Sequence, residues 1–163
     1  IAGPMHTRTA RDRLGGYKKA LMDRRIDYKE EYVKIGEYKS QWGWEAAKAF
    51  LSEKISFDAI FCGNDLIAIG AIKALKEEGM KVPDDIGIMG FDDIYMSSIV
   101  EPPLTTVKQP NYEMGYRAAE LLINAIESEN RETAAQAGKT DTIILDTELT
   151  IRKSVKDGKG VTV

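Results

Sequence analysis

The sequence has 163 residues, of which 43% are hydrophobic and 30% charged, and its formal net charge is -3. This length supports one folded domain with a sizeable core, and the composition excludes disordered and fibrous classes. The negative charge argues against nucleic-acid binding by this segment itself, because phosphate contacts depend on a basic surface. One cysteine, Cys62, cannot form an internal disulfide, and His6 alone cannot complete a zinc site with it. This cysteine usage favours a cytoplasmic protein.

Hydrophobic spacing predicts the elements of the first third of the chain. They are, in order, the end of a strand at residues 1–4, a helix at 9–25, a short strand at 32–35 and a helix at 41–54. The abrupt start in a strand suggests an artificial or proteolytic boundary. The first helix carries apolar residues at helical spacing, and Thr7 or Thr9 can cap it.

The middle of the chain alternates strands with helices. Its elements are a strand at 59–62, a helix at 65–78, a strand at 86–90, a short amphipathic segment at 94–100 and an extended segment at 104–107. Cys62 falls in an apolar strand, where thiols are usually inert packing. The helix at 65–78 is apolar on most of its circumference, so it requires a second buried face such as a subunit contact.

The last third is predicted to hold a helix, a loop and one more strand. The helix is expected at 112–127, a polar loop at 129–140, and a loose tail at 156–163. The alternating segment at 142–152 is expected to be an edge strand or a strand with one solvent-exposed face. Strands that alternate with helices of ten or more residues indicate an α/β fold, a Rossmann-like parallel sheet with helices on both faces.

Polar residues follow the ends of several predicted strands. In open parallel sheets, ligands bind beyond the carboxyl ends of the strands, so Asn64 and Asp92 are the first candidates for ligand contacts. Arg11, Tyr38 and Gln109 are predicted at the same sheet edge, although a solvated arginine, a core tyrosine and a surface amide are the plainer alternatives. The set contains no nucleophile with a base, which favours a binding module over an enzyme.

Asp92 and Asp93 leave a different reading open. Two carboxylates at a strand end could hold Mg²⁺ or accept a phosphoryl group. The structural alternative is that Asp93 caps the short helix after it while Asp92 contacts solvent. We therefore keep a magnesium-dependent enzyme as a third class of function.

Three segments together resemble the LacI/GalR family of bacterial transcriptional regulators. They are Gly-Asn-Asp-Leu-Ile-Ala-Ile-Gly-Ala at 63–71, Val-Pro-Asp-Asp-Ile-Gly-Ile-Met-Gly-Phe-Asp-Asp at 82–93 and Pro-Pro-Leu-Thr-Thr-Val-Lys-Gln-Pro at 102–110. Ala-Gly-Pro at 2–4 and the segment at 148–154 extend the match across nearly the whole chain. The resemblance implies one lobe of a type I periplasmic-binding-protein-like effector domain, without a cofactor, and a helix-turn-helix head upstream.

The resemblance also assigns residues to an effector site and to a dimer contact. The effector contacts it implies are Arg11, Asn64, Asp92, Tyr38, Gln109 and Thr7. The dimer contacts it implies are Leu66, Ile69, Ile72, Met96, Ile99 and Val100. A sugar or sugar phosphate is expected as effector in preference to a purine, a homodimer is expected, and operator DNA would be bound only through the upstream head.

The family's domain layout divides the chain into three parts. Residues 1–107 and 140–154 would form the carboxy-terminal lobe, 108–139 would belong to the otherwise missing amino-terminal lobe, and 155–163 would be a tail. The helix at 112–127 would then lack its own sheet, so we expect it to dock on a neighbouring chain, move or be poorly ordered. The alternative to a regulator is an exported sugar-binding protein for transport or chemotaxis, which shares this architecture.

Overall fold

Three short parallel strands organise the structure, a computed structural model that describes residues 1–129 and 142–156. β1 (Ala59–Phe61), β2 (Gly87–Asp92) and β3 (Thr105–Lys108) lie side by side, and β4 (Glu148–Thr150) completes the order β1-β2-β3-β4. β4 lies at an edge of the sheet, as its alternating sequence predicts. The expected strand at 142–152 is nevertheless too long, because only its last part pairs.

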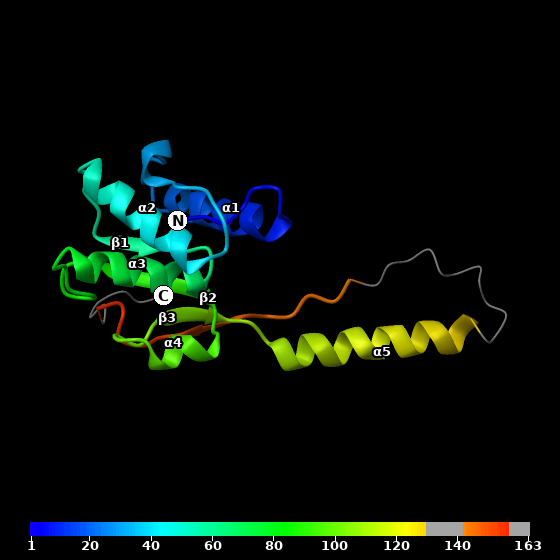
Figure 1. The fold of residues 1–163 in the computed structure, drawn as a ribbon. Helices are drawn as coiled ribbons and strands as arrows, with labels where there is room; N and C mark the ends of the chain where they lie inside the picture. The colour runs from blue at the N-terminus through cyan, green and yellow to red at the C-terminus, as the bar shows by residue number, and fades with distance from the viewer. Residues whose placement is uncertain (130–141, 157–163) are drawn as a thin grey trace. The chain divides into compact units, whose positions relative to one another are not determined.

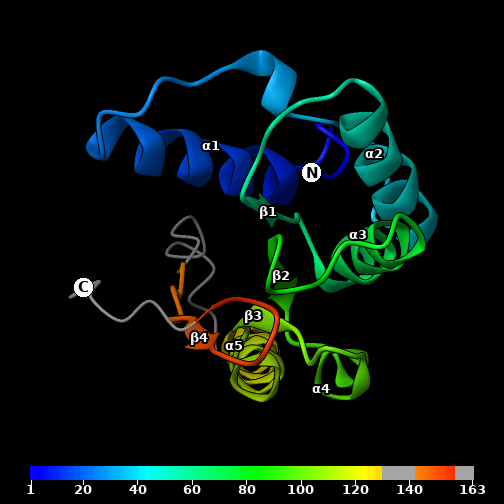
Figure 2. The ribbon, with the colours of Figure 1, turned by 90° about the vertical axis from the view of Figure 1, so that its left-hand side faces the viewer.

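Helices cover both faces of this sheet (Figures 1 and 2). α1 (Arg8–Asp23) lies on one side, and α2 (Ser40–Ser52) and α3 (Asp65–Glu77) lie on the other. The short α4 (Tyr95–Ile99) follows β2. Parallel strands joined through helices on both faces confirm the predicted α/β fold class.

The predicted strand at residues 32–35 is wrong. Glu30–Tyr32 forms a single 3-10 turn, and only Ile35 makes a bridge, which pairs it with Ala2. The first residues of the chain do behave as the end of a strand. The Gly63 amide donates to the Ile1 carbonyl at 2.7 Å, so the segment lies beside the residues that follow β1.

Glycines allow α2 and α3 to pack backbone against backbone. A Cβ at Gly43 would lie 1.9 Å from the Ile67 carbonyl oxygen, and one at Gly70 would lie 1.8 Å from the Ser40 carbonyl oxygen. α3 is therefore enclosed between the sheet and α2, and eight of its thirteen residues are buried. Much of the second buried face that the sequence required of α3 thus comes from α2 in the same chain, not from a partner.

The chain divides into two units, of which unit 1 comprises residues 1–108 and 149–163 and unit 2 comprises residues 109–148. Unit 2 contains α5 (Asn111–Glu129), whose apolar side chains are exposed. Those side chains include Met114 (45% exposed), Leu121 (37%) and Leu122 (62%). The assignment of this helix to a second lobe stays a prediction. Most of the polar loop at 129–140 and of the tail lies outside the described residues.

Among the described residues, no helix has the length and apolar composition needed to cross a bilayer.

Candidate ligand-binding site

Asn64, which follows β1, and Asp92, which is the last residue of β2, lie at the same level of the sheet. The register pairs Phe61 of β1 with Met89 of β2, and each candidate lies three residues beyond its member of that pair. Because the strands are parallel, both side chains belong to the carboxyl edge of the sheet, where ligands bind in open α/β folds. The sequence prediction that they share this edge is therefore correct.

Asn64 is the N-cap of α3. Its side-chain Oδ1 accepts a hydrogen bond from the Ile67 amide at 2.9 Å, and the residue is only 7% exposed. This bond satisfies one of the amides that a helix start leaves free. Within the described part of the chain, Nδ2 of Asn64 has no hydrogen-bond acceptor, so two donor hydrogens remain for a ligand.

Arg13 is the residue that connects the candidates. Its guanidinium donates to Oδ1 of Asp92 at 2.8 Å and to the Gly63 carbonyl at 2.6 Å. The guanidinium also lies 3.8 Å from the centre of the Phe91 ring and 6.0 Å from that of Tyr38. The side chain is 11% exposed, so this is a partly buried ion pair packed on an aromatic face.

The two carboxylates at the end of β2 have separate arginine partners. Asp92 pairs with Arg13, and Asp93 pairs with Arg152 at 2.6 Å. Both aspartates have positive φ, 109° for Asp92 and 54° for Asp93. Non-glycine residues rarely adopt such backbone angles, and strained positions of this kind concentrate at functional sites. Asp93 therefore does not act as a cap of α4, whose N-cap is Ile94.

The ring of Tyr38 packs against the backbone of Gly3. A Cβ at Gly3 would lie 2.3 Å from ring atoms of Tyr38, so glycine is what permits this ring position. The phenolic oxygen is buried and has no hydrogen-bond partner among the residues that the structure describes. A buried hydroxyl without a partner is costly, so this position of the ring carries an energetic penalty.

The remaining candidates are engaged locally or lie in the other unit. Thr7 is the N-cap of α1, because Oγ1 accepts from the Ala10 amide and donates to the Pro4 carbonyl. The exposed Arg11 donates to the carbonyl oxygens of Met5 and His6 at 2.9 and 3.0 Å. Gln109 opens unit 2. The roles of these three residues in effector binding stay predictions.

Sequence reasoning overlooked Arg13 and chose Arg11 instead. The overlooked signal was helical spacing: Arg13 lies three residues after buried Ala10 and four before Tyr17, so it belongs to the apolar face of α1. Arg11 is turned away from that face. A lone guanidinium on an apolar stripe requires a buried partner, and the sheet edge offers Asp92.

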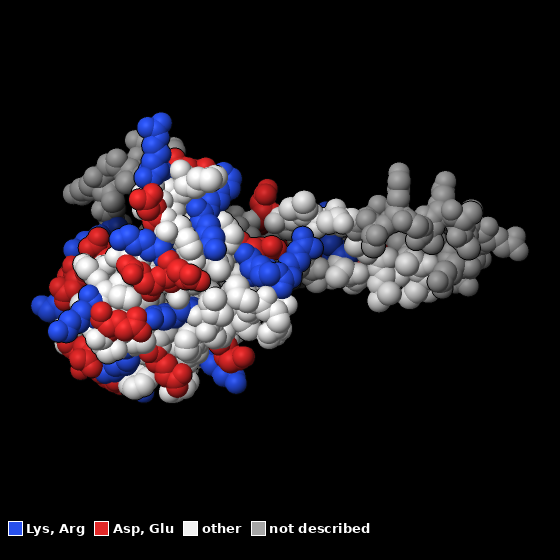
Figure 3. Space-filling model, turned by 90° about the horizontal axis from the view of Figure 1, so that it is seen from above, with Lys and Arg blue, Asp and Glu red and all other residues white. Residues whose placement is uncertain are grey.

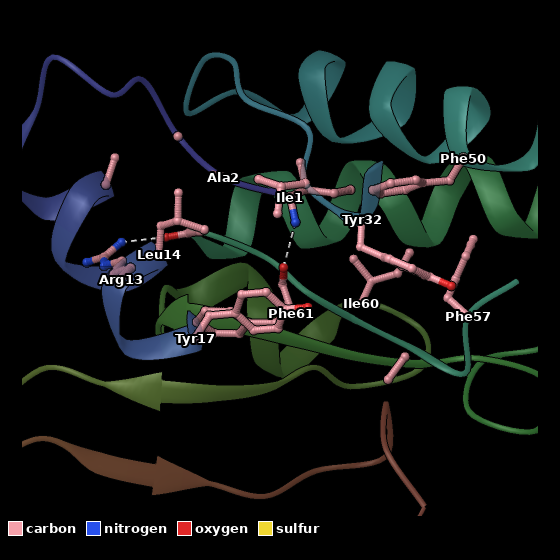
Figure 4. A pocket seen from close by; sticks show the side chains of 15 residues that line it. Ile1, Ala2, Arg13, Leu14, Tyr17, Tyr32, Phe50, Phe57, Ile60 and Phe61 are labelled. Carbon is pink, nitrogen blue, oxygen red and sulfur yellow. Dashed lines mark hydrogen bonds between the residues drawn. The ribbon is translucent and has the colours of Figure 1, made fainter. Parts of the chain in front are cut away.

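A cavity of about 90 Å³ opens beside this cluster, between α1 and β1 (Figure 4). Arg13, Leu14 and Tyr17 of α1 line it together with Phe57 and Phe61. The lining is mostly apolar, so the cavity is distinct in character from the polar cluster, although both share Arg13. Its existence means that the inner face of α1 is incompletely packed against the sheet.

Cys62 lies beneath the cluster and is inert. The thiol is fully buried in the core. Burial raises its pKa from the ordinary 9.0 to about 11, because a thiolate would be poorly solvated there. The packing interpretation of this residue is confirmed, and a nucleophilic role is unsupported.

The residues expected at a dimer contact separate into exposed and buried ones. Met96 (46% exposed) and Ile99 (56%) project from α4, and Leu66 (40%) projects from α3. Ile69 and Val100 are half-buried and line a groove beside α3. Ile72 borders the same groove but is only 2% exposed and belongs to the core of this chain. Its role in a dimer contact, like that of the other five residues, stays a prediction.

The fold is an α/β domain that carries this polar cluster at the carboxyl edge of its parallel sheet. The periplasmic binding protein-like domain model matches residues 1–155, and the chain belongs to that family. Among its relatives is the HTH-type transcriptional repressor PurR of Haemophilus influenzae (strain PittEE), which is 36% identical over 156 residues. That alignment covers 96% of this chain and 45% of the relative, so the chain spans about half the length of the curated relatives it matches.

Solved regulators have the same fold. A transcriptional regulator CelR–cellobiose complex superimposes with a TM-score of 0.83 at 33% identity, covering 94% of this chain and 45% of that one. A lac repressor dimer bound to operator and the anti-inducer ONPF gives 0.80 at 31% identity, covering 94% and 50%. These matches confirm the resemblance to effector-binding domains of the LacI/GalR type.

Proposed function

We propose that this chain is the effector-sensing and dimer-forming part of a transcriptional repressor. The observation that carries the proposal is the Arg13–Asp92 ion pair beside the Asn64 cap, at the carboxyl edge of a parallel sheet. Together these groups offer donors, acceptors and two aromatic faces, which suit a small polar molecule. In this proposal the molecule exchanges contacts with Arg13 and Asp92 when it binds.

A sugar or sugar phosphate is the ligand class that this cluster suits best. A carboxylate and a guanidinium pair well with adjacent hydroxyls, and a ring can lie against Tyr38 or Phe91. The CelR neighbour is described as a complex with cellobiose, which supports this class. The PurR relatives favour a purine base as the second candidate.

Ligand titration of the full-length protein that carries this chain tests the proposal. Isothermal calorimetry is run with monosaccharides, cellobiose, sugar phosphates and purine bases. One compound is expected to bind, and Asp92→Asn is expected to weaken its binding at least about tenfold, because a charge-assisted hydrogen bond is lost. Asp93→Asn is the matched control, since Asp93 pairs with Arg152 instead. Equal losses from the two variants would remove Asp92 from the site.

We also propose that a second copy of this chain covers the exposed apolar residues of α3 and α4. Leu66, Met96 and Ile99 provide an apolar surface of the kind that homodimers bury. Dimeric lac repressor structures among the neighbours favour a second copy as the occupant. Ile99→Arg is expected to shift sedimentation from dimer to monomer. Met22→Arg, which changes an apolar residue of α1 that is also exposed (69%, against 56% for Ile99), should leave a dimer.

Operator binding, in this proposal, belongs to a part of the protein outside this chain. The formal charge is -3, and acidic and basic side chains of unit 1 lie interspersed on the face in Figure 3. A protein that binds operator DNA would act in the cytoplasm. The coding sequence upstream of Ile1 distinguishes a helix-turn-helix segment from the secretion signal of an exported sugar-binding protein.

Catalysis by the two aspartates receives no support from their surroundings. Asp92 and Asp93 each pair with an arginine through Oδ1, and a cation at this position would compete with two guanidinium groups already bound there. Among the described residues, no group of three or more His, Cys, Asp and Glu side chains could hold a metal. Titration with Mg²⁺ should therefore leave the melting temperature of the protein unchanged.

A further inference from the structure

Asp65 is a buried carboxylate with no role in the proposed site. It is the first residue of α3, 1% exposed, and follows directly after Asn64. β2 makes room for it at Gly90, where a Cβ would lie 2.2 Å from Oδ1 of Asp65. A buried charge of this kind is costly unless its oxygens accept several hydrogen bonds.

Both oxygens of Asp65 do accept hydrogen bonds, and the donors come from separate elements. Oδ2 accepts from the Ile94 amide at 2.9 Å and from the Ser97 hydroxyl at 2.7 Å, and Oδ1 accepts from the Thr106 hydroxyl at 2.5 Å. Ser97 and Thr106 are both fully buried. One carboxylate thus joins the start of α3, the segment after β2, the middle of α4 and β3.

The residues joined by Asp65 border both the candidate ligand site and the exposed apolar residues of α4. Asn64 directly precedes Asp65, and the strained Asp92–Asp93 pair directly precedes Ile94. Ser97 lies on the inner side of a single helical turn whose neighbours Met96 and Ile99 are exposed. α4 lies on the same side of the sheet as α3 (Figure 2).

We propose that Asp65 is a positioning residue that couples the polar site to the exposed surface of α4. Oδ2 of Asp65 accepts hydrogen bonds from the Ile94 amide and the Ser97 hydroxyl, and these hold the segment after Asp93 and the middle of α4 against the start of α3. A shift of Asp92 or Asn64 is thereby passed to α4. α4 is only five residues long, and besides Asp65 it is held by the hydrogen bond that the Leu104 amide donates to the Ser97 carbonyl at 2.8 Å. The bond to Asp65 is the charge-assisted one of the two, so the orientation of α4 depends on the carboxylate. This coupling rests on the proposed function, because it gives the ligand site a route to the dimer surface.

A double-mutant cycle without ligand tests the coupling. Hydrogen exchange of the α4 amides is measured in the full-length protein for Asp92→Asn, alone and combined with Ser97→Ala. We expect Asp92→Asn alone to speed α4 exchange about tenfold, the effect of losing one charge-assisted bond. In the Ser97→Ala background we expect less than about twofold further change, because the link is already broken.

Two controls separate coupling from general stability. Ser98→Ala removes a hydroxyl from the next residue of α4, which donates to the Tyr95 carbonyl and not to Asp65. Thr106→Val removes a bond to the same carboxylate on the side away from α4. In both backgrounds Asp92→Asn should retain its tenfold effect on α4, even where Thr106→Val lowers the melting temperature.

Additive effects in the Ser97→Ala background, or no effect of Asp92→Asn on α4, would overturn the coupling. Ligand titration separates this failure from failure of the proposed function. Coupling with no ligand bound from the whole panel would refute the ligand class and leave the role of Asp65 standing. If a ligand binds but the effects of Asp92→Asn and Ser97→Ala on α4 exchange simply add, the coupling is refuted and the proposed function stands.

Discussion

α3 and α1 cover opposite faces of one sheet, and they are held there by different forces (Figure 2). α3 buries eight of thirteen residues, whereas α1 buries one of sixteen, Ala10. Apolar packing against the sheet and α2 fixes α3. α1 depends instead on its Thr7 cap and on the Arg13 bonds to Gly63 and Asp92. The molecule thus joins a rigid half to a helix held by a few polar contacts.

The candidate ligand site lies where these two halves meet. Asn64 belongs to the rigid half, because it caps α3, and Arg13 belongs to the weakly packed helix. The cavity of about 90 Å³ under α1 lowers the packing that resists its motion. A ligand that competes for Arg13 would therefore shift α1, while α3 would stay in place.

Glycine substitutions in the two helices give the largest expected contrast. Gly70→Ala should cost about 3 kcal/mol or more in unfolding free energy, because its Cβ would meet the Ser40 carbonyl of α2. Gly15→Ala should instead stabilise by about 0.5–1 kcal/mol, since nothing lies within 4 Å and alanine favours a helix. Urea unfolding followed by circular dichroism measures both. A Gly70→Ala protein as stable as wild type would contradict the close packing of α2 on α3.

Leucine truncations sharpen the same contrast with apolar contacts alone. Leu75→Ala removes a fully buried side chain of α3 and should cost about 3 kcal/mol. Leu21→Ala, which shortens a half-buried side chain of α1, should lower the unfolding free energy by less than about 1 kcal/mol. Similar losses for the two variants would mean that α1 is packed as firmly as α3.

Alkaline pH should weaken the rigid half through Cys62. Its pKa is 9.0 ordinarily and about 11 in the folded protein, so the unfolded chain loses the proton first as pH rises. Stability from the neutral thiol is intact below pH 9 and is lost between pH 9 and about 11, by about 2–3 kcal/mol. Cys62→Ala should flatten this part of the stability–pH curve. A curve with the same slope in both proteins would remove Cys62 as its cause.

Replacing arginines of α1 should give the smallest change in stability and show which arginine holds the helix on the sheet. Arg13→Gln should destabilise α1 by roughly 1–2 kcal/mol, seen as faster hydrogen exchange of its amides with α3 unaffected. Arg8→Gln breaks an exposed pair with Asp12 and should change exchange by less than about 0.5 kcal/mol. Uniform loss of protection in α1 and α3 would contradict the separation into two halves.

The sequence indicated the fold well because its signals were local. Gly79, with φ of 76°, ends α3 where a glycine after an apolar helix predicts an end, and Asn64 begins it as a cap. The strand at 32–35 was predicted from three apolar or aromatic residues, Tyr32, Val33 and Ile35, but a strand needs a neighbouring strand to pair with. Only Ala2 is available to Ile35, so pairing stops at one bridge.

The site was predicted less completely because its connections are long-range. Asn64 and Asp92 could be found from strand ends, since parallel strands finish at one edge. Arg13 reaches Asp92 across 79 residues, and no local pattern names that partner. The close packing of α2 on α3 could not be predicted locally either, because it depends on Gly43 meeting the backbone of α3 and Gly70 meeting the backbone of α2.

In the proposed function the arginine that contacts the ligand is Arg13, and not its neighbour Arg11. Calorimetric titration of the full-length protein with the compound that binds in the panel tests this directly, with Arg13→Gln and Arg11→Gln compared side by side. The account predicts at least about a tenfold weaker affinity for Arg13→Gln and a change below about threefold for Arg11→Gln. Loss of binding in Arg11→Gln with Arg13→Gln unaffected would contradict it, and the Arg13–Asp92 pair would then be only a brace for α1.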